Sequence, residues 1–174
     1  ASDLQQDGEV GHCEWQGMEV IKILQGNCLE VLKDLPEQSV NTCITSPPYW
    51  GLRNYQEEEQ LGLEDTPEEY VENLVKVFRE VKRVLRDDGT VWLNLGDSFS
   101  KEKQLQGTPW RVSFALQSDG WYLRQDIIWH KPAPMPESVT DRCTKAHEYI
   151  FLLSKNKKYY FDNESIKEDA VGNN

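Results

Sequence analysis

The strongest constraint on the fold is a long helical pattern that lies between two strand-like runs. The runs at 40–45 (VNTCIT) and 90–95 (TVWLNL) are rich in apolar and β-branched residues, which is typical of buried strands. Between them, residues 66–89 carry apolar side chains at helical spacing. A strand, a helix and a second strand in this order favour an α/β sheet with helices on its faces.

Capping residues mark both ends of this helix. Thr66 fits the N-cap, Pro67 the first helical position, and Glu69 completes a T-x-x-E capping box. Gly89 is the predicted stop. The apolar stripe between these ends consists of Tyr70, Val71, Leu74, Phe78, Val81 and Leu85. We therefore predict one amphipathic helix that buries a single face.

Weaker signals extend the alternation on both sides, so we predict an α/β fold. A second capped helix is expected from Thr108-Pro109 to about residue 120. The other predicted elements are a strand at 19–24, a helix at 28–35, and strand candidates at 122–129, 149–153 and 158–161. In such sheets ligands bind at the carboxyl ends of strands, which places a site after Thr45 and Leu95.

Composition favours one compact domain. The chain has 174 residues, 38% of them hydrophobic, with no apolar run near the roughly 18 residues of a membrane span and no secretory signal. We expect a cytoplasmic protein of bacterial, archaeal or phage origin. Residues 1–18 are polar and aperiodic, so we expect a loosely ordered tail before a catalytic region at 19–174. The four cysteines form no CxxC pair, which predicts no metal site, and Cys28 and Cys43 are expected to be buried thiols.

The clearest chemical signature follows the strand at 40–45 and reads Ser46-Pro47-Pro48-Tyr49-Trp50. Two consecutive prolines remove two backbone donors and restrict the preceding residues, so the loop is stiff. Its carbonyls have no neighbouring N–H to bond and can face a ligand, while the two rings offer a stacking surface. Taken alone, the string is also compatible with a rigid turn that exposes two aromatics.

These properties suit the methylation of a base amino group. The exocyclic nitrogen is a poor nucleophile because its lone pair is delocalised into the ring. Acceptors beside its N–H hydrogens help it to take up positive charge during attack, and fixed alignment supplies much of the remaining rate. The base must first leave the duplex, and a ring such as Tyr49 can replace the stacking that is lost.

The run TSPPYW resembles the catalytic motif of DNA amino-methyltransferases, which methylate N4 of cytosine or N6 of adenine. The stretch ILQGNCLEVLKDLPEQSVNTCITSPPYWGLRNY is similar to the opening of the β-class enzymes, in which the catalytic loop precedes the cofactor-binding glycine loop. The later stretches VWLNLGDSF, GWYLRQDIIWHKPAPMPESVTDRCTKAHEYIFLLSK and KYYFD resemble the strands that follow. The resemblance runs from about Ile21 to Phe161.

The resemblance implies a Rossmann-like, S-adenosylmethionine-dependent methyltransferase sheet that acts on double-stranded DNA, as in restriction–modification systems. Ser46 and the Pro47 carbonyl would hold the target amino group, with Pro48 completing the catalytic loop. Tyr49 would stack on the flipped base, with Trp50 beside it. Members with serine first and tryptophan last often methylate N4 of cytosine, which favours that target, and N6 of adenine stays open.

The resemblance also suggests contacts around this loop. Cofactor contacts would come from Asn27, Cys28, Thr45 and Ser46, although the family commonly has Gly-Asp where this chain has Asn27-Cys28. Asp97 is either a support of the pocket or a loop cap. The pair His147-Glu148 resembles a pair near the catalytic pocket, and a core histidine is the alternative.

The balance of charge permits a DNA-binding face. The net charge is −11, but residues 101–160 hold 10 Lys and Arg against 6 Asp and Glu. The candidate phosphate contacts are Arg53, just after the catalytic loop, and Lys131, Arg142 and Lys145 in a proline-rich segment. Solvated surface charge is the alternative for each of them.

One expected signature is absent from the sequence. None of the eleven glycines forms the G-x-G loop that cradles the cofactor in this family, so the sheet is expected to be incomplete in this chain. Either a second polypeptide or a missing C-terminal part carries that loop, or the protein is a non-catalytic DNA-binding subunit. A homodimer is left open.

Overall fold

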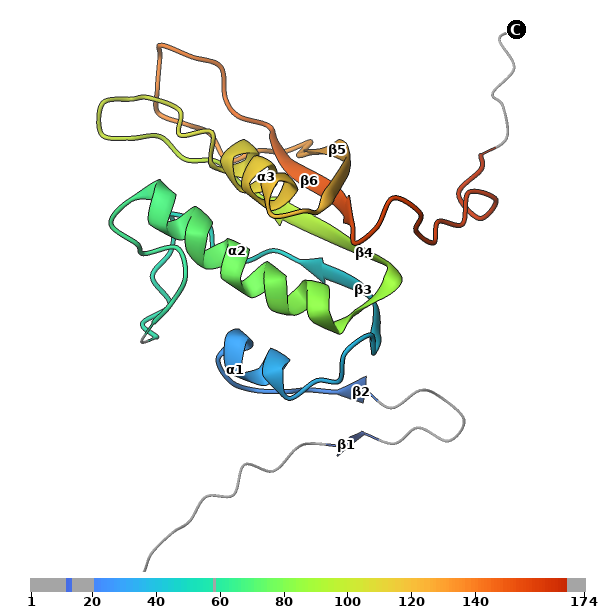
Figure 1. Ribbon diagram of the computed structural model, residues 1–174. Coiled ribbons are helices and arrows are strands. Elements are labelled where there is room, and N and C mark those ends of the chain that lie inside the picture. The colour runs from blue at the N-terminus through green and yellow to red at the C-terminus, as the bar shows by residue number, and fades with distance from the viewer. Residues whose placement is uncertain (1–11, 14–20, 58, 169–174) are drawn as a thin grey trace, which may run out of the picture.

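The computed structural model describes residues 12–13, 21–57 and 59–168, and its central feature is a four-stranded mixed sheet (Figure 1). The strands lie in the order β3 (Val40–Thr45), β4 (Leu85–Leu95), β6 (His147–Ser154) and β5 (Tyr122–His130). β3 and β4 are parallel, whereas β6 is antiparallel to both of its neighbours. The predicted α/β class is thus confirmed.

A short antiparallel pair, β1 (His12–Cys13) and β2 (Ile21–Lys22), lies apart from this sheet. β2 falls within the strand predicted at 19–24. Most of the tail predicted at 1–18 lies outside the described residues. The strand candidate at 158–161 forms no strand, and the backbone N–H of Tyr160 instead donates to the carbonyl of Asp88 at 3.0 Å.

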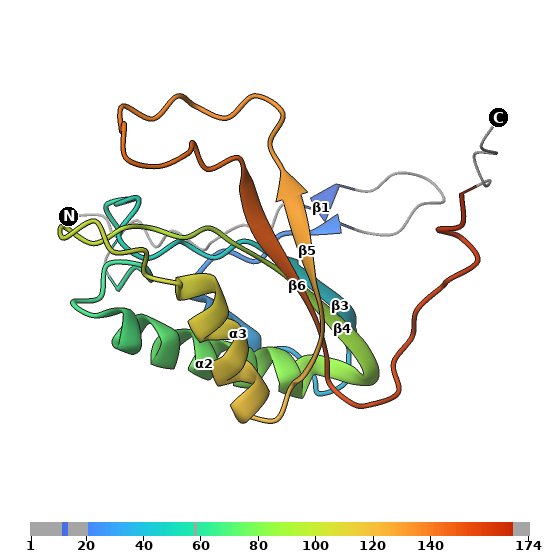
Figure 2. The same ribbon diagram turned by 90° about the horizontal axis from the view of Figure 1, so that it is seen from above.

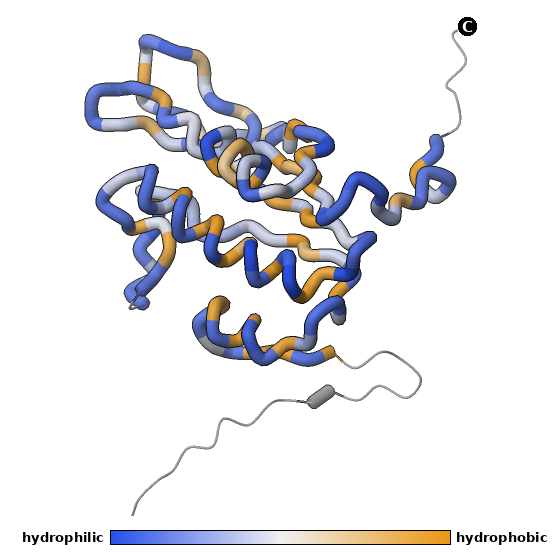
Figure 3. Tube along the Cα trace, viewed as in Figure 1, coloured by the Kyte–Doolittle hydropathy of each residue, from blue (hydrophilic) through white to orange (hydrophobic). Residues whose placement is uncertain are grey.

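Helix α2 (Pro67–Val84) is the predicted amphipathic helix. The Thr66 side chain accepts a hydrogen bond from the Glu69 N–H at 3.2 Å, which is the capping contact that the sequence predicts. Apolar and polar residues alternate along the coil, as the orange and blue segments of α2 show in Figure 3. Its apolar face packs into a core with β4, β6 and α3, whose fully buried members include Tyr70, Phe78, Leu93, Leu116 and Phe151.

The helix stop predicted at Gly89 is wrong. α2 ends at Val84, because Leu85 adopts an extended conformation (φ −68°, ψ 140°) and begins β4. Leu85 is fully buried and pairs with Val40, so tertiary contact ends the helix before the glycine is reached.

Gly89 has a different role, inside an irregular part of β4. The next paired residues after Val40 and Leu85 are Thr42 and Thr90, so residues 86–89 interrupt the register. A Cβ at position 89 would lie 2.9 Å from a backbone oxygen of this interruption and 3.0 Å from the Asn41 carbonyl. Close backbone approach, rather than a helix cap, therefore explains this glycine.

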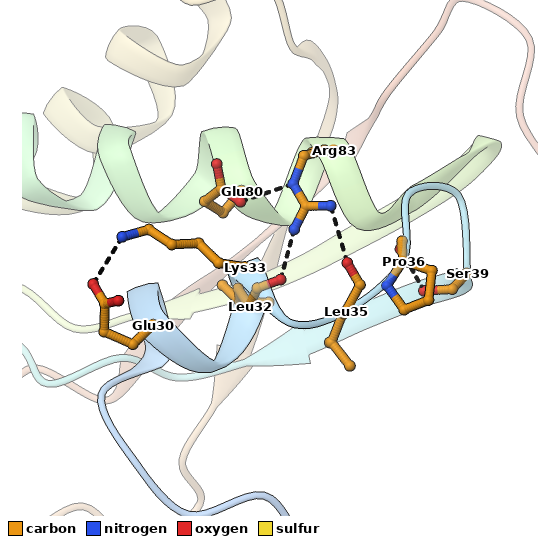
Figure 4. A network of polar contacts seen from close by, with 8 residues as sticks. All are labelled: Glu30, Leu32, Lys33, Leu35, Pro36, Ser39, Glu80 and Arg83. Carbon is orange, nitrogen blue, oxygen red and sulfur yellow. Dashed lines mark hydrogen bonds and ion pairs between the residues drawn. The ribbon is translucent and has the colours of Figure 1, made fainter.

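The remaining helices are α1 (Cys28–Lys33) and α3 (Thr108–Ser118). α3 agrees in extent with the second predicted helix, but the cap predicted at Thr108 is wrong, because Gly107 is the N-cap and no side chain of the cap forms a hydrogen bond. α1 ends two residues before the predicted Leu35. Figure 2 shows α2 and α3 on one face of the sheet. α1 has no buried residue and is tied to α2 by Arg83, which donates to the carbonyls of Leu32 at 2.6 Å and Leu35 at 3.0 Å (Figure 4).

The expectation that 40–45 is a buried strand is wrong. β3 is an edge strand of the four-stranded sheet, and Ile44 is 78% exposed because no helix within 21–57 and 59–168 covers its face. Cys28 is exposed rather than buried, since it begins the peripheral helix α1, and Cys43 is partly buried. No helix among the described residues is both long and apolar enough to cross a membrane.

Candidate active site

The proline-rich loop leaves the sheet at the carboxyl end of β3, beside the end of β4. Its backbone is anchored to α2, because the hydroxyl of the buried Tyr70 donates to the Pro48 carbonyl at 2.9 Å. The Pro47 carbonyl accepts no hydrogen bond from the described part of the chain. One carbonyl of the loop is therefore used structurally and the other is available to a ligand.

Tyr49 is held by its hydroxyl and by its ring. The hydroxyl lies 3.0 Å from Ser46 Oγ and donates to Glu148 Oε2 at 3.1 Å. The ring lies against Gly96, where a Cβ would be 2.6 Å from Cε2 of the ring. Burial raises the pKa of Tyr49; the Ser46 hydrogen bond opposes this rise and the Glu148 carboxylate adds to it, so the phenol keeps its proton at neutral pH.

A cavity of about 310 Å³ opens beside this loop, near the lower end of the usual range for small-molecule sites. It is lined by Ser46, Pro47, Tyr49, Leu52, Arg53, Tyr55 and Glu148. Three predicted catalytic residues and the predicted phosphate contact Arg53 thus meet at one hollow. We refer to it as the loop cavity.

A second cavity, of about 460 Å³, shares Ser46 and Pro47 with the loop cavity. Cys28, Thr45 and Ser46, three of the predicted cofactor contacts, line it together with apolar side chains of α1 and α2. We refer to it as the apolar cavity. Asn27 lines an adjoining hollow of about 580 Å³ that Cys28 also borders, and its Oδ1 accepts from the Leu29 N–H at 2.9 Å as the N-cap of α1.

Glu148 joins the loop to the antiparallel strands. Its carboxylate pairs with the Lys131 ammonium and accepts from Asn94 Nδ2 at 3.1 Å, in addition to Tyr49. Burial opposes ionisation, but the three donors together outweigh it and hold the pKa of Glu148 below its ordinary value. The carboxylate is therefore charged at neutral pH.

Two predicted phosphate contacts are committed to other groups. Lys131 pairs with Glu148, and Arg142 pairs with Glu137 while its guanidinium carbon lies 4.0 Å from the Phe99 ring centroid. Lys145 lies 6.0 Å from the Tyr149 ring centroid, and burial lowers the pKa of its ammonium. Of the four candidates, Arg53 is the exposed one that borders the loop cavity.

The remaining candidates have structural contacts. The Trp50 indole N–H donates to the Glu64 carbonyl at 2.9 Å, and this side chain packs against the core rather than lining the loop cavity. Asp97 accepts from the backbone N–H groups of Gly107 and Thr108, both at 3.1 Å, so it caps the entry to α3. The His147 ring lies edge-on to Tyr149, with centroids 5.1 Å apart.

Sequence reasoning missed Leu52, Tyr55 and Asn94. The first two line the loop cavity because the chain folds back after the motif, where the Gly51 N–H donates to the Gly62 carbonyl at 2.8 Å. Their closeness in sequence to the motif was the available signal. Asn94 points to Glu148 across paired strands, which no sequence spacing indicates.

Comparison with known proteins agrees with this geometry. The family described as DNA methylase, N6_N4_Mtase, matches residues 40–172, which include the loop and all four strands of the sheet. The chain belongs to this DNA methylase family. Both the resemblance of the sequence and the Rossmann-like methyltransferase fold are thereby confirmed.

Two type II methyltransferases are similar to the chain. Type II methyltransferase M.SmaI of Serratia marcescens is 47% identical over 91% of this chain and 64% of its own length. M.SfiI of Streptomyces fimbriatus is 49% identical over 82% of the chain and 38% of its own length.

Solved structures support the fold. The putative DNA modification methylase TTHA0409 of Thermus thermophilus, complexed with S-adenosyl-L-methionine, has a TM-score of 0.61 at 29% identity, over 80% of this chain and 57% of its own. The cytosine-N4-specific PvuII DNA methyltransferase has a TM-score of 0.67 at 22% identity, over 82% and 53%. The chain thus spans about half to two thirds of the length of M.SmaI and of these two structures.

Proposed function

We propose that this DNA methylase chain forms the base-binding half of an enzyme that transfers a methyl group from S-adenosylmethionine to an exocyclic amino group of a flipped base. The observation that carries the proposal is that Ser46 and Pro47 line two cavities at once. A group in the loop cavity and a group in the apolar cavity would meet at these residues. Such shared walls suit a direct transfer between two bound molecules.

The loop supplies the groups that the target nitrogen needs. Ser46 Oγ and the free Pro47 carbonyl are acceptors for the two amino hydrogens, and Tyr49 offers its ring to the base. As the nitrogen lone pair forms the new bond to the methyl carbon, the carbon–sulfur bond breaks with its electron pair on sulfur. One amino proton then leaves to solvent. The target base favoured by a motif that begins with serine and ends with tryptophan is cytosine, at N4.

The residues of the apolar cavity fit part of the cofactor. Val31, Val77 and Phe78 offer apolar contact, and Thr45 and Ser46 bring polar atoms to the end near the loop. No lysine or arginine lines this cavity or the adjoining one among the described residues, so the carboxylate of the cofactor finds no cationic partner here. S-adenosylmethionine would supply an electrophilic methyl group, and Cys28, Thr45 and Ser46 would border its binding site.

We further propose that sequence outside this chain completes the site. The M.SmaI match leaves about a third of that protein uncovered, and this chain contains no G-x-G loop. The exposed edge of β3 lies next to the apolar cavity, where a further strand could pair with it. A glycine loop at the end of such a strand would face Cys28 and Ser46. This completing segment lies either on the same polypeptide or on a companion.

Labelled transfer tests the proposal. The chain is incubated with double-stranded DNA and methyl-labelled S-adenosylmethionine, alone and together with the region of M.SmaI that it does not match. We expect label on DNA only when that region is present, and nucleoside digestion then names the base. Label on adenine would replace the cytosine assignment. Bound DNA without label in every combination would instead indicate a non-catalytic binding subunit, and light scattering would show whether two copies assemble.

A further inference from the structure

The carboxylate of Glu148 can act only as an acceptor. Lys131 donates to one of its oxygens, and Asn94 Nδ2 and the Tyr49 hydroxyl donate to the other. The Asn94 amide cannot be reversed without placing its oxygen against the carboxylate, so its orientation agrees with a charged Glu148. A charged carboxylate has no hydrogen to give, and every contact with it must therefore bring one.

This requirement settles the hydrogen bond between Tyr49 and Ser46. A phenol has one hydrogen, and Tyr49 gives it to Glu148. The 3.0 Å contact between the Tyr49 hydroxyl and Ser46 Oγ must then use the hydrogen of Ser46. The Ser46 hydrogen is therefore directed at the Tyr49 hydroxyl, and the lone pairs of Ser46 Oγ are left for a ligand in the loop cavity.

We propose that Glu148 is a positioning residue that sets the direction of this hydrogen-bond chain and thereby makes Ser46 Oγ an obligate acceptor for the target amino group. The inference rests on the proposed function, because it concerns the same loop cavity. Without Glu148, the Ser46 hydroxyl could turn its hydrogen toward an amino group that also carries hydrogens, and the two donors would repel. The chain also polarises Ser46, since linked hydrogen bonds strengthen one another.

Substitution of the carboxylate by an amide should reverse the chain. In Glu148→Gln, Lys131 would take the amide oxygen, so the amide N–H₂ would face Tyr49. Tyr49 would then donate to Ser46, and the Ser46 hydrogen would point into the loop cavity. In the assembly proposed to carry out transfer, we expect kcat to fall by about a hundredfold, the lower end of the loss when one preorganised contact is removed, with little change in KM for DNA.

Tyr49→Phe is the decisive second variant. It removes the link while keeping a ring in place, so Ser46 can turn freely and kcat should fall less than in Glu148→Gln. Adding Glu148→Gln to Tyr49→Phe should cause no further loss, because Glu148 acts through the Tyr49 hydroxyl. Glu80→Gln is the matched control, since Glu80 also pairs with a cation, Arg83, but lies outside both cavities. A wild-type kcat in Glu148→Gln would overturn the proposal. So would a double variant in which Glu148→Gln lowers kcat by the same factor as it does in the wild type.

A measurement without turnover separates this inference from the proposed function. The difference in ultraviolet absorbance between the wild type and Tyr49→Phe isolates the ionisation of Tyr49 during titration with base. Because the Glu148 carboxylate contributes to the raised pKa of Tyr49, Glu148→Gln should lower it. If no methyl is transferred under any condition, the proposed function fails, and this titration still tests whether the Glu148 carboxylate acts on the Tyr49 hydroxyl. An unmoved pKa of Tyr49 would refute that action.

Discussion

Gly96 shows how one missing side chain can shape a site. Its Cα lies where any Cβ would come within 2.6 Å of the Tyr49 ring, closer than carbon atoms approach one another in proteins. Its backbone angle is not in the left-handed region, so space rather than conformation requires glycine here. The ring of Tyr49 is therefore positioned by Gly96, the residue directly after the end of β4.

A double-mutant cycle tests this contact. Gly96→Ala should lower the free energy of unfolding by about 1–3 kcal/mol, the usual cost of overpacking. In a Tyr49→Ala background the same substitution should cost much less, because the ring that it displaces is gone. Urea unfolding of the four proteins measures both values. Equal costs in the two backgrounds would show that the ring and Gly96 do not press on each other.

Glu148 should make the free energy of unfolding depend on pH in the acid range. Its pKa is lowered in the folded protein, so the stability that it contributes is present above the unfolded pKa of about 4.3 and is lost as the pH falls through the folded value. Glu148→Gln has no proton to take up at this site. Urea unfolding from neutral pH into the acid range should therefore show a shallower loss in the variant than in the wild type, and parallel curves would contradict the assignment.

At the scale of elements, Arg83 connects α1 to the body of the protein. It donates to two carbonyls near the end of α1 while its side chain is 27% exposed. This charge-assisted contact adds to the packing of the partly buried Leu29 and Leu32 against the core. This helix carries Cys28 and Val31 into the wall of the apolar cavity. Its tether is thus a condition for the shape of that wall.

Arg83→Met should lower the free energy of unfolding by about 1–2 kcal/mol, because two carbonyls lose a charged donor. Arg79→Met is the matched control on the same helix. Arg79 is 62% exposed and pairs with Asp119, so its loss should cost less than about 1 kcal/mol. Chemical unfolding compares the two, and equal costs would mean that Arg83 does not tether α1.

At the scale of the whole molecule, the net charge is acidic, so few of the predicted phosphate contacts remain available to DNA. Lys131 and Arg142 are paired with carboxylates, whereas Arg53 has no ion-pair partner among the described residues and borders the loop cavity. In the assembly proposed to carry out transfer, Arg53→Gln should weaken DNA binding and reduce its salt dependence by about one phosphate contact. Arg142→Gln should change both less. Fluorescence anisotropy over a series of salt concentrations measures the DNA affinity and its salt dependence for both variants. A larger effect of Arg142→Gln than of Arg53→Gln would assign the phosphate contact to Arg142.

Local signals predicted the elements well and their ends less well. The T-P-x-E sequence located the start of α2, where Thr66 caps the helix, because capping depends on neighbouring residues. The T-P pair located the start of α3, but Gly107 is the N-cap there and Asp97 accepts the hydrogen bonds that a capping side chain would accept. The end of α2 was predicted at a glycine, yet Leu85 ended it by pairing with Val40. Burial of 40–45 was predicted from its composition, but exposure depends on which strands lie alongside, and that information is not in the segment.

The sequence by itself determined the alternation of helices and strands between residues 28 and 154, the stiff loop at 46–50 and the family, because proline geometry, capping and hydrophobic period act between near neighbours. Tertiary structure alone decided what surrounds that loop. Glu148 meets Tyr49 across 99 residues of chain, and Gly96 reaches the same ring from the end of another strand. Such contacts arise only when packed strands bring distant segments together, and they turn a rigid bend into a directed set of acceptors.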